Sequence, residues 1–505
     1  MSAKVTSIGL KGMEGYHVNV EVGTFMGTDS IKIVGLPDAA VKESKERIIA
    51  ALRSLGYTLS GQKIIINLSP AEQKKSGPMF DFPMAISVLL SLNELTAQIP
   101  NNTGFIGALS LDGMILPFEG MLPSVLAAKR LGIEKLYLPF DKNLPRLEFE
   151  GMELVYVSCL QEAIKHLLGQ WSAPFSIRNE ERDEQIYYLD FKQIVGQRHA
   201  KHALEVAAAG EHHVLMTGPP GCGKSLLAES FPSILPPLTK EAQLEVMSLY
   251  QLSGNAFPHI KLPPYRNPHH SASGISIIGG GQYPKPGEIS LAHRGVLFLD
   301  EIAEFPKKTL DMLRQPFENE NVTISRTHAT LTYPASFILI AAMNPCPCGY
   351  AGSNSHYCTC SPKQILSYKN KLSGPLRDRI DIQLILKPID FKKIHGREEP
   401  SMAIRERVEK ARERQYDRYG RGICNSRVPY EELVKRSPLS REQQRTLQHF
   451  FIKRNWSNRT QIKIIRLART ISDLKASPNI TDESIWEATM LNSGQERRES
   501  ALRGM

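Results

Sequence analysis

The sequence of 505 residues has no run of eighteen apolar residues, which argues against a membrane-spanning helix. Its first residues, MSAKVTSIGLKG, lack the apolar core of a signal peptide. Seven cysteines in so long a chain are too few for a disulfide scaffold, which indicates a reducing compartment. We therefore expect a cytoplasmic protein without a membrane partner.

The sequence also lacks the low hydrophobicity of disordered chains. Its hydrophobic content of 41% excludes wholesale disorder. The net charge of +10 is unevenly spread, since residues 396–505 hold 23 basic and 15 acidic side chains, a net charge of +8. Such a basic end suits a polyanion such as nucleic acid. Opposite charges also recur at helical spacing in residues 404–412, as on a solvated helix. The charge alone leaves both interpretations open.

A glycine-rich segment predicts a phosphate-binding loop between the strand-like residues 213–217 and the helix-like residues 226–229. In such a loop, backbone N–H groups surround the nucleotide phosphates, the lysine neutralises charge and the final hydroxyl binds Mg²⁺. We assign the binding of ATP and Mg²⁺ to Gly218, Pro219, Pro220, Gly221, Cys222, Gly223, Lys224 and Ser225.

An acidic pair follows the apolar residues 296–299. Asp300 is expected to hold Mg²⁺ through water, together with Ser225, and Glu301 to orient the water that attacks ATP. A glycine-rich turn alone resembles a phosphate loop by chance, but strand, loop, helix and acidic pair in this order predict an ATPase.

Four of the seven cysteines form two closely spaced Cys-x-Cys pairs, Cys346 with Cys348 and Cys358 with Cys360. Four thiolates in two close pairs can enclose a tetrahedral Zn²⁺. Because Cys-x-Cys is tighter than the common Cys-x-x-Cys, free thiols or a redox pair remain alternatives. The polar, glycine-containing segment between the pairs favours a loop held by zinc.

The pattern of the chain predicts a multidomain α/β protein, because residues 1–170 alternate strand-like and helix-like runs while helical patterns dominate the C-terminal part. Residues 172–185 are charged and contain few large apolar residues, which predicts a linker. We expect an N-terminal α/β domain at 1–170, a linker at 171–189, an ATPase core at 190–390 that contains the four-cysteine loop 346–360, and a helical domain at 391–505.

Several strings of residues resemble the ComM/YifB subfamily of magnesium-chelatase-like AAA+ ATPases, and in their shared order they extend over nearly the whole chain. They are VGLPDAAVKESKERIIAAL (34–52), GQRHAKHALEVAAAGEHHVLMTGPPGCGKS (196–225), RNPHHSAS (266–273), GGGQYPKPGEISLAHRGVLFLDE (279–301), MNPCPCGY (343–350) and SGPLRDRIDI (373–382).

The resemblance implies a P-loop AAA+ core with a helical lid domain, in a homohexamer whose active sites lie between subunits. It also implies that Asn344 senses the γ-phosphate, that Arg379 enters the neighbour's site, and that Arg459 is a second sensor. The family has an apolar residue where this chain has Arg377, so two arginines compete for the trans role and we favour Arg379.

The same resemblance implies an ATP-driven DNA motor, a helicase or branch-migration enzyme of natural transformation and recombination that acts on single-stranded or branched DNA. The alternative is a chelatase-type remodelling subunit that acts on a protein partner. A third possibility, a peptidase, depends on the N-terminal domain.

Residues 1–170 resemble the proteolytic domain of Lon-type proteases, which uses a serine-lysine dyad. The serine position, after Gly77-Pro78, holds Met79, and the lysine position falls near Leu122. Neither side chain can act as a nucleophile or a base. We expect the fold without peptide hydrolysis, and Lys74 and Lys75 do not readily replace the dyad.

Two further segments are candidates for contact with a substrate. Residues 322–332 alternate β-prone and polar residues like a hairpin, and in this AAA+ branch a hairpin before the first sensor faces the central pore. Arg326 and His328 near its tip are candidate phosphate contacts. The paired His269 and His270 lie in a glycine-rich insertion, and without an acidic third ligand they are weak evidence for a metal.

Overall fold

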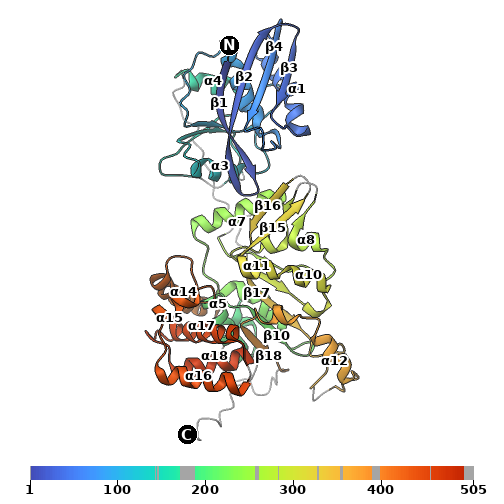
Figure 1. Cartoon of the computed structure of the whole chain (residues 1–505), viewed down its shortest axis with the longest axis vertical. Helices are drawn as coiled ribbons and strands as arrows, with labels where there is room; N and C mark the ends of the chain where they lie inside the picture. The colour runs from blue at the N-terminus through green and yellow to red at the C-terminus, as the bar shows by residue number, and fades with distance from the viewer. Residues whose placement is uncertain are drawn as a thin grey trace. The chain divides into compact units, whose positions relative to one another are not determined.

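The computed structural model describes residues 2–142, 144, 147–170, 188–255, 261–281, 284–326, 329–352, 356–388, 398–454 and 456–493. The chain divides into two compact units, residues 1–184 with 247–259 and residues 185–246 with 260–505. The expected linker at 171–189 lies outside the described residues except for 188 and 189. Figure 1 shows the elements of both units along the chain.

The first unit is built on a mixed seven-stranded sheet with the order β3-β4-β2-β1-β5-β8-β9. Its two long strands, β1 and β2, pair antiparallel, and buried side chains of β2 alternate with partly exposed ones, as expected of a sheet with one more open face. The strands are β1 (Ser2–Lys11), β2 (Glu14–Met26), β3 (Ser30–Val34), β4 (Gln62–Ser69), β5 (Thr103–Phe105), β8 (Lys135–Leu138) and β9 (Glu153–Tyr156), with the small pair β6 (Ala108–Leu109) and β7 (Ile115–Leu116).

The helices of this unit are α1 (Ala39–Ser54), α2 (Asp81–Ser91), α3 (Met121–Arg130) and α4 (Leu160–Leu167). Helix α1 begins where the side chain of Asp38 accepts a hydrogen bond from the Val41 N–H at 2.9 Å. Helix α2 is almost wholly buried, and its Asp81 is bound by Arg47 of α1 with an N–O distance of 2.6 Å. A buried ion pair therefore fixes α1 against α2.

The second unit contains a five-stranded parallel sheet with the order β11-β14-β17-β10-β18. All residues of β14 and β17 are buried, which agrees with helices on both faces of a parallel sheet. The strands are β10 (Val214–Thr217), β11 (Tyr265–Arg266), β14 (Val296–Leu299), β17 (Ile338–Met343) and β18 (Ile382–Ile385).

Short helices and two small hairpins surround this sheet. The helices are α5 (Arg198–Gly210), α6 (Lys224–Ser230), α7 (Lys240–Ser253), α8 (Gly274–Ile278), α9 (Glu288–Leu291), α10 (Lys307–Met312), α11 (Arg314–Asn319), α12 (Pro362–Lys369) and α13 (Gly374–Arg377). The hairpins pair β12 (Gly279–Gly280) with β13 (Lys285–Pro286), and β15 (Asn321–Arg326) with β16 (Ala329–Pro334). The second is the hairpin predicted from the alternation of residues 322–332.

The C-terminal part is helical, as predicted, and consists of α14 (Ser401–Tyr419), α15 (Tyr430–Arg436), α16 (Arg441–Arg454), α17 (Asn458–Leu474) and α18 (Asp482–Ser493). These helices lie beside α5 and β18 in Figure 1. Apolar side chains of α5, the sheet, α14, α17 and α18 form one continuous buried cluster. The helices are therefore packed onto the sheet through a common core. Among the described residues, no helix combines the length and apolar character needed to cross a bilayer.

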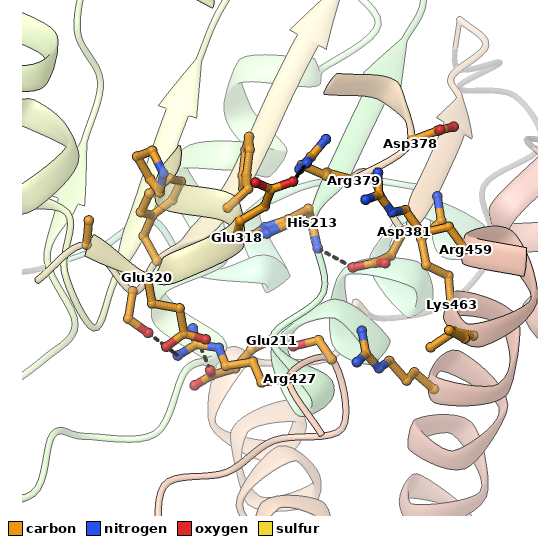
Figure 2. Close-up of a pocket in the computed structure, with 18 residues that line it drawn as sticks. Glu211, His213, Glu318, Glu320, Asp378, Arg379, Asp381, Arg427, Arg459 and Lys463 are labelled. Atoms are coloured by element: carbon orange, nitrogen blue, oxygen red, sulfur yellow. Dashed lines mark hydrogen bonds and ion pairs between the residues drawn. The ribbon is translucent and has the colours of Figure 1, made fainter. Parts of the chain in front are cut away.

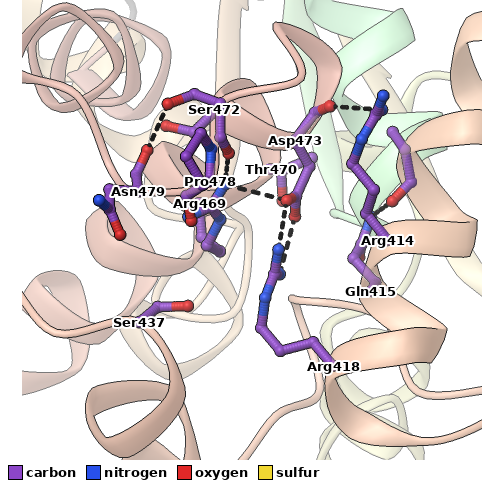
Figure 3. A network of polar contacts seen from close by, with 12 residues as sticks. Arg414, Gln415, Arg418, Ser437, Arg469, Thr470, Ser472, Asp473, Pro478 and Asn479 are labelled. Carbon is purple, nitrogen blue, oxygen red and sulfur yellow. Dashed lines mark hydrogen bonds and ion pairs between the residues drawn. The ribbon is translucent and has the colours of Figure 1, made fainter.

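Asp473, at the end of α17, is the centre of a buried polar network that joins α17, α14 and the loop after α14 (Figure 3). Its carboxylate accepts hydrogen bonds from Arg418 of α14 at 2.7 Å, from Arg469 at 3.0 Å and from Asn425 at 2.9 Å. Arg469 and Asp473 are both fully buried. Two arginines therefore depend on one carboxylate for their charge compensation.

We expect Asp473→Ala to lower the free energy of unfolding of the helical region by about 3–5 kcal/mol, because it leaves two buried arginines without their partner. Trp456 and Trp486 lie in this region, so urea unfolding can be followed by tryptophan fluorescence. The matched control is Asp417→Ala, which removes an exposed aspartate of α14, with an expected change within about 0.5 kcal/mol. Equal effects of the two substitutions would contradict this role of Asp473.

Candidate nucleotide-binding site

The glycine-rich loop leaves the C-terminal end of β10 and enters α6 at Lys224. Gly221 and Gly223 have φ angles of +75° and +90°, which favour glycine. Gly218 is needed for a different reason, since a Cβ there would lie 2.9 Å from the Leu386 carbonyl oxygen. The sequence pattern thus provides both the left-handed turns and the close approach that this loop requires.

The Lys224 ammonium group lies within the loop and reaches the end of the neighbouring strand β17. It donates hydrogen bonds to the carbonyl oxygens of Gly218 at 2.8 Å and Pro219 at 3.0 Å, and to Oδ1 of Asn344 at 3.1 Å. Asn344 directly follows β17. The predicted phosphate lysine and the predicted γ-phosphate sensor therefore meet.

The acidic pair lies at the end of β14. The Ser225 hydroxyl donates to Oδ2 of Asp300 at 3.0 Å, while the Glu301 N–H donates to the other oxygen, Oδ1, at 2.9 Å. Glu301 has a φ angle of +48°, and its side chain is half-exposed. Hydroxyl and carboxylate oxygens are ligands that Mg²⁺ accepts, so this pair fits the predicted Mg²⁺ position.

Strand topology explains why these groups converge. Strands β14, β17 and β10 are adjacent and parallel, with Val296 opposite Ile338 and Val214 opposite Ile340. Their C-terminal ends therefore meet at one edge of the sheet, where open α/β sheets bind their ligands. Lys224, Ser225, Asp300, Glu301 and Asn344 all follow these three ends.

Two polar residues at this edge were missed or undervalued in the sequence. Gln197 donates through Nε2 to the carbonyl oxygens of Cys222 at 3.1 Å and Lys387 at 2.9 Å, which ties the loop to the chain beyond β18. His270 lies with its Nδ1 4.0 Å from a carboxylate oxygen of Glu301, and its ring packs on His269. The approach of His270 to Glu301 could not be predicted from the sequence, because the two residues are distant along the chain and are brought together only by the fold.

The four cysteine sulfurs, all within 4.8 Å of one another, form a cluster shortly after Asn344. The Sγ atom of Cys346 lies 3.3 Å from that of Cys348 and 3.7 Å from that of Cys358, and Cys348 and Cys358 are 3.6 Å apart. The cluster is compatible with zinc.

The predicted trans residue Arg379 and the predicted second sensor Arg459 lie elsewhere, in a cavity of about 380 Å³ that both line (Figure 2). His213, Phe337 and Asp381 line the same cavity and directly precede β10, β17 and β18. This cavity is therefore at the N-terminal edge of the sheet, opposite the phosphate loop. Four strand residues at about 3.3 Å each put roughly 13 Å between the two edges.

Arg379 is held in this cavity by its own chain. It donates to the Pro375 carbonyl oxygen at 2.6 Å and forms an ion pair with Glu318. Burial and the nearby charge of Arg459 lower the pKa of Arg379. Arg377 does not line the cavity and instead donates to the Lys369 carbonyl oxygen.

The wall of the cavity contains a buried carboxylate, Asp381, which accepts from the His213 N–H at 3.1 Å. Burial alone would raise the pKa of Asp381, but the contact with His212 outweighs it and lowers this pKa to about 2. Burial lowers the pKa of His213 to about 4, so this ring is neutral near pH 7 and accepts from Leu339 N–H through Nδ1. These contacts hold together the starts of β10, β17 and β18, and Arg379 lies three residues before β18.

In the first unit, the positions that correspond to the Lon dyad hold the buried side chains of Met79 and Leu122. Lys75 is also buried, and its ammonium group donates to the Pro70 carbonyl oxygen. Burial lowers the pKa of Lys75, as a lysine base would require. However, residue 79 is a methionine and offers no hydroxyl nucleophile, and the nearby Tyr16 hydroxyl donates its hydrogen bond to the Lys74 carbonyl oxygen. The described residues contain no serine-lysine dyad at these positions.

The β15–β16 hairpin packs on the glycine hairpin formed by β12 and β13. A Cβ on Gly279 would lie 2.8 Å from Cδ1 of Ile324, and one on Gly280 would lie 3.1 Å from a guanidinium nitrogen of Arg326. Arg326 is exposed, whereas His328 lies outside the described residues. The two segments that the sequence marked as substrate contacts are thus neighbours.

Comparison with known proteins gives three matches to models of magnesium chelatase. Residues 190–394 match "Magnesium chelatase, subunit ChlI", residues 20–142 match "Subunit ChlI of Mg-chelatase", and residues 398–492 match "Magnesium chelatase, subunit ChlI C-terminal". The matches therefore extend over both units.

Relatives of similar length carry the comparison further. Competence protein ComM of Haemophilus influenzae is 36% identical over 487 residues, 94% of each chain, and the uncharacterized protein YifB of Escherichia coli is 36% identical over 482 residues with the same coverage. Lon protease 2 of Bacillus subtilis is 29% identical over 167 residues, 30% of each chain. The likeness to Lon proteases accounts for the N-terminal fold that the sequence predicted.

Proposed function

This chain belongs to the ComM/YifB family of magnesium-chelatase-like AAA+ proteins, and on that premise we propose that it is an ATP-hydrolysing hexameric motor acting on DNA. One observation carries the ATPase: Lys224, Ser225, Asp300 and Asn344 meet at one edge of the sheet, through contacts of 3.0 and 3.1 Å. Lys224 binds the β- and γ-phosphates, and Ser225 with Asp300 holds Mg²⁺. Glu301 orients the attacking water, and Asn344 contacts the γ-phosphate.

Lys224→Ala is expected to weaken ATP binding, because it removes the cation of the phosphate loop. Glu301→Gln is expected to bind ATP and hydrolyse it about 10²-fold more slowly or worse, since the water loses its orienting carboxylate. Glu304→Gln is the matched control, because this exposed glutamate pairs with Lys371 at 3.3 Å and has no assigned role. Binding of a fluorescent ATP analogue and phosphate release measure the two steps. Near-normal turnover in Glu301→Gln would contradict the assignment.

The position of Arg379 supports a site shared between subunits. Arg379 and Arg459 line a cavity at the opposite edge of the sheet from Lys224 in the same chain. Arg459 has no hydrogen bond or ion pair to another side chain in the described part of the chain. Two adjacent guanidinium groups repel each other, and an anion between them relieves that repulsion. The phosphates of a neighbouring subunit's ATP are such an anion. Arg379 would leave its ion pair with Glu318 to bind them.

Mixing Arg379→Ala subunits with Lys224→Ala subunits should restore part of the ATPase activity that each variant lacks alone. A mixed interface combines an intact Lys224 from one subunit with an intact Arg379 from the other. The control mixture pairs Arg377→Ala with Lys224→Ala, and Arg377→Ala alone should keep its activity. Recovery that required Arg377 instead would transfer the trans role to that residue, and no recovery in verified mixed rings would argue against a shared site.

We further propose that Cys346, Cys348, Cys358 and Cys360 bind one Zn²⁺. In a tetrahedral site with Zn–S bonds of about 2.3 Å, neighbouring sulfurs are about 3.8 Å apart. The sulfur separations of 3.3, 3.7 and 3.6 Å lie near that value. Four thiolates are a donor set that selects zinc over Mg²⁺ or Ca²⁺.

DNA as the substrate is supported by the relative named competence protein ComM and by the exposed Arg326 at the end of β15. The basic C-terminal region supports it less than its charge suggests. Several arginines there bind their own fold: Arg407 pairs with Glu205 at 2.6 Å, Arg412 with Glu211 at 3.1 Å and Arg418 with Asp473 at 2.7 Å. The hairpin is therefore our main candidate for a phosphate contact.

Binding through phosphates predicts that log affinity falls linearly with log salt, with a slope of about −0.7 to −0.9 per contact. Arg326→Ala should make this slope shallower and reduce strand movement more than basal ATP turnover. Arg436→Ala is the control, since this exposed arginine pairs with Glu432 on α15. The measurement is a salt titration with fluorescent single-stranded and branched DNA, alongside strand-displacement assays.

A chelatase-type remodelling subunit is the second candidate function, because magnesium-chelatase models match residues 20–142, 190–394 and 398–492. That function predicts weak DNA binding with little salt dependence, and stimulation of ATP turnover by a protein partner. A verified hexamer that neither moves branched DNA nor is stimulated by it would favour this alternative.

A further inference from the structure

The segment between the two cysteine pairs packs against the phosphate loop. Gly349, between the two cysteine pairs, has a φ angle of +86°, and a Cβ added there would lie 2.9 Å from both Cδ and Cγ of Pro220. Pro220 belongs to the phosphate loop. Contacts shorter than 3.0 Å require one partner to move, so the backbone at Gly349 already lies against the proline ring.

The turn that carries Gly349 is shaped around the first cysteine. The Gly349 N–H donates to the Cys346 carbonyl oxygen at 3.0 Å, and the Ala351 N–H donates to the Cys346 sulfur at 3.2 Å. Cys346 is fully buried. The position of Gly349 therefore depends on where the Cys346 sulfur is held.

The same segment also carries the predicted phosphate sensor. Asn344 stands two residues before Cys346, and its Oδ1 accepts from Lys224 at 3.1 Å. Tyr350 stacks on His356 with a centroid distance of 4.7 Å, which connects the turn to the second cysteine pair. The cluster thus borders the nucleotide site on two sides, at Pro220 and at Asn344.

We propose that the metal-bound cysteine cluster supports the phosphate loop, so that metal occupancy sets nucleotide affinity. A metal that coordinates the four sulfurs fixes the turn around Cys346. This turn then holds Pro220 and Asn344 in place. Without the metal, the two cysteine pairs are free to separate, and the loop loses the surface against which it is ordered. This inference rests on the proposed zinc and nucleotide sites.

The chain offers a matched pair of substitutions that separates this contact from the metal itself. Gly352 belongs to the same loop and has a φ angle of +78°, but a Cβ there meets nothing within 4 Å. Gly349→Ala and Gly352→Ala therefore introduce similar backbone strain. Only Gly349→Ala presses on Pro220.

We expect both variants to contain one zinc per chain by metal analysis. With Mg²⁺ and a fluorescent ATP analogue, Gly349→Ala should bind about tenfold more weakly than the unaltered protein, and Gly352→Ala should bind normally. Circular dichroism and urea unfolding check that both are folded. Equal affinities of the two zinc-containing variants would overturn the proposal.

A second measurement uses the unaltered chain and does not depend on the folding of a variant. Removal of zinc with a chelator should lower the affinity for the ATP analogue, and added zinc chloride should restore it. In Gly349→Ala, zinc removal should add little, because the contact through which it acts is already disturbed. Unchanged affinity after verified zinc loss would overturn the support role while leaving the nucleotide site intact.

The remaining outcomes reject the premises separately. If freshly prepared, reduced protein contains no zinc and takes up none when zinc is added, the proposed metal site is rejected. The inference is then rejected with it. Zinc-containing, folded protein that does not bind the ATP analogue would instead reject the proposed nucleotide site and, with it, this coupling.

Discussion

The parallel alignment of β14, β17 and β10 is the constraint on which the candidate site depends. Each strand is short, buried and followed directly by a polar group, Asp300 after β14, Asn344 after β17 and the phosphate loop after β10. Side chains that are far apart in sequence meet because adjacent parallel strands end at a common edge. Burial of the strands fixes that edge, since a shift of one residue would move every buried side chain of β17 to the opposite packed face of the sheet.

The same alignment separates the site into two halves. Residues that follow a strand lie at one edge of the sheet. Arg379 precedes β18, and Arg459 in the first turn of α17 lines the same cavity, so both lie at the other edge. A single chain therefore presents a nucleotide-binding edge and a cationic edge that cannot serve one ATP. The ring proposed above would resolve this geometry, because a heterologous interface puts unlike surfaces of successive subunits in contact.

The sequence predicted what depends on local patterns. Residues 296–299, the loop 218–225 and the hairpin at 322–332 were all recognisable, since strand hydrophobicity, glycine spacing and alternation are local properties. It did not predict the contact of His270 with Glu301, the bond of Gln197 to Cys222, or the use of C-terminal arginines as internal partners. Each of these depends on residues brought together by the fold, and a charge count cannot distinguish an arginine that binds DNA from one that binds Asp473.

That distinction changes where a polyanion is expected to bind. Arg418 and Arg469 are committed to a buried carboxylate, so their charge is compensated inside the fold and contributes little to the surface potential. Arg326 is exposed on a hairpin that packs on the glycine hairpin after α8, and that insertion begins near His270 and Glu301. The proposed phosphate contact at Arg326 is thus connected through packed segments to Glu301, the proposed residue for orienting the attacking water. If the proposed DNA motor is correct, the coupling between ATP hydrolysis and DNA is expected to run through residues 266–334 rather than through the basic C-terminal helices.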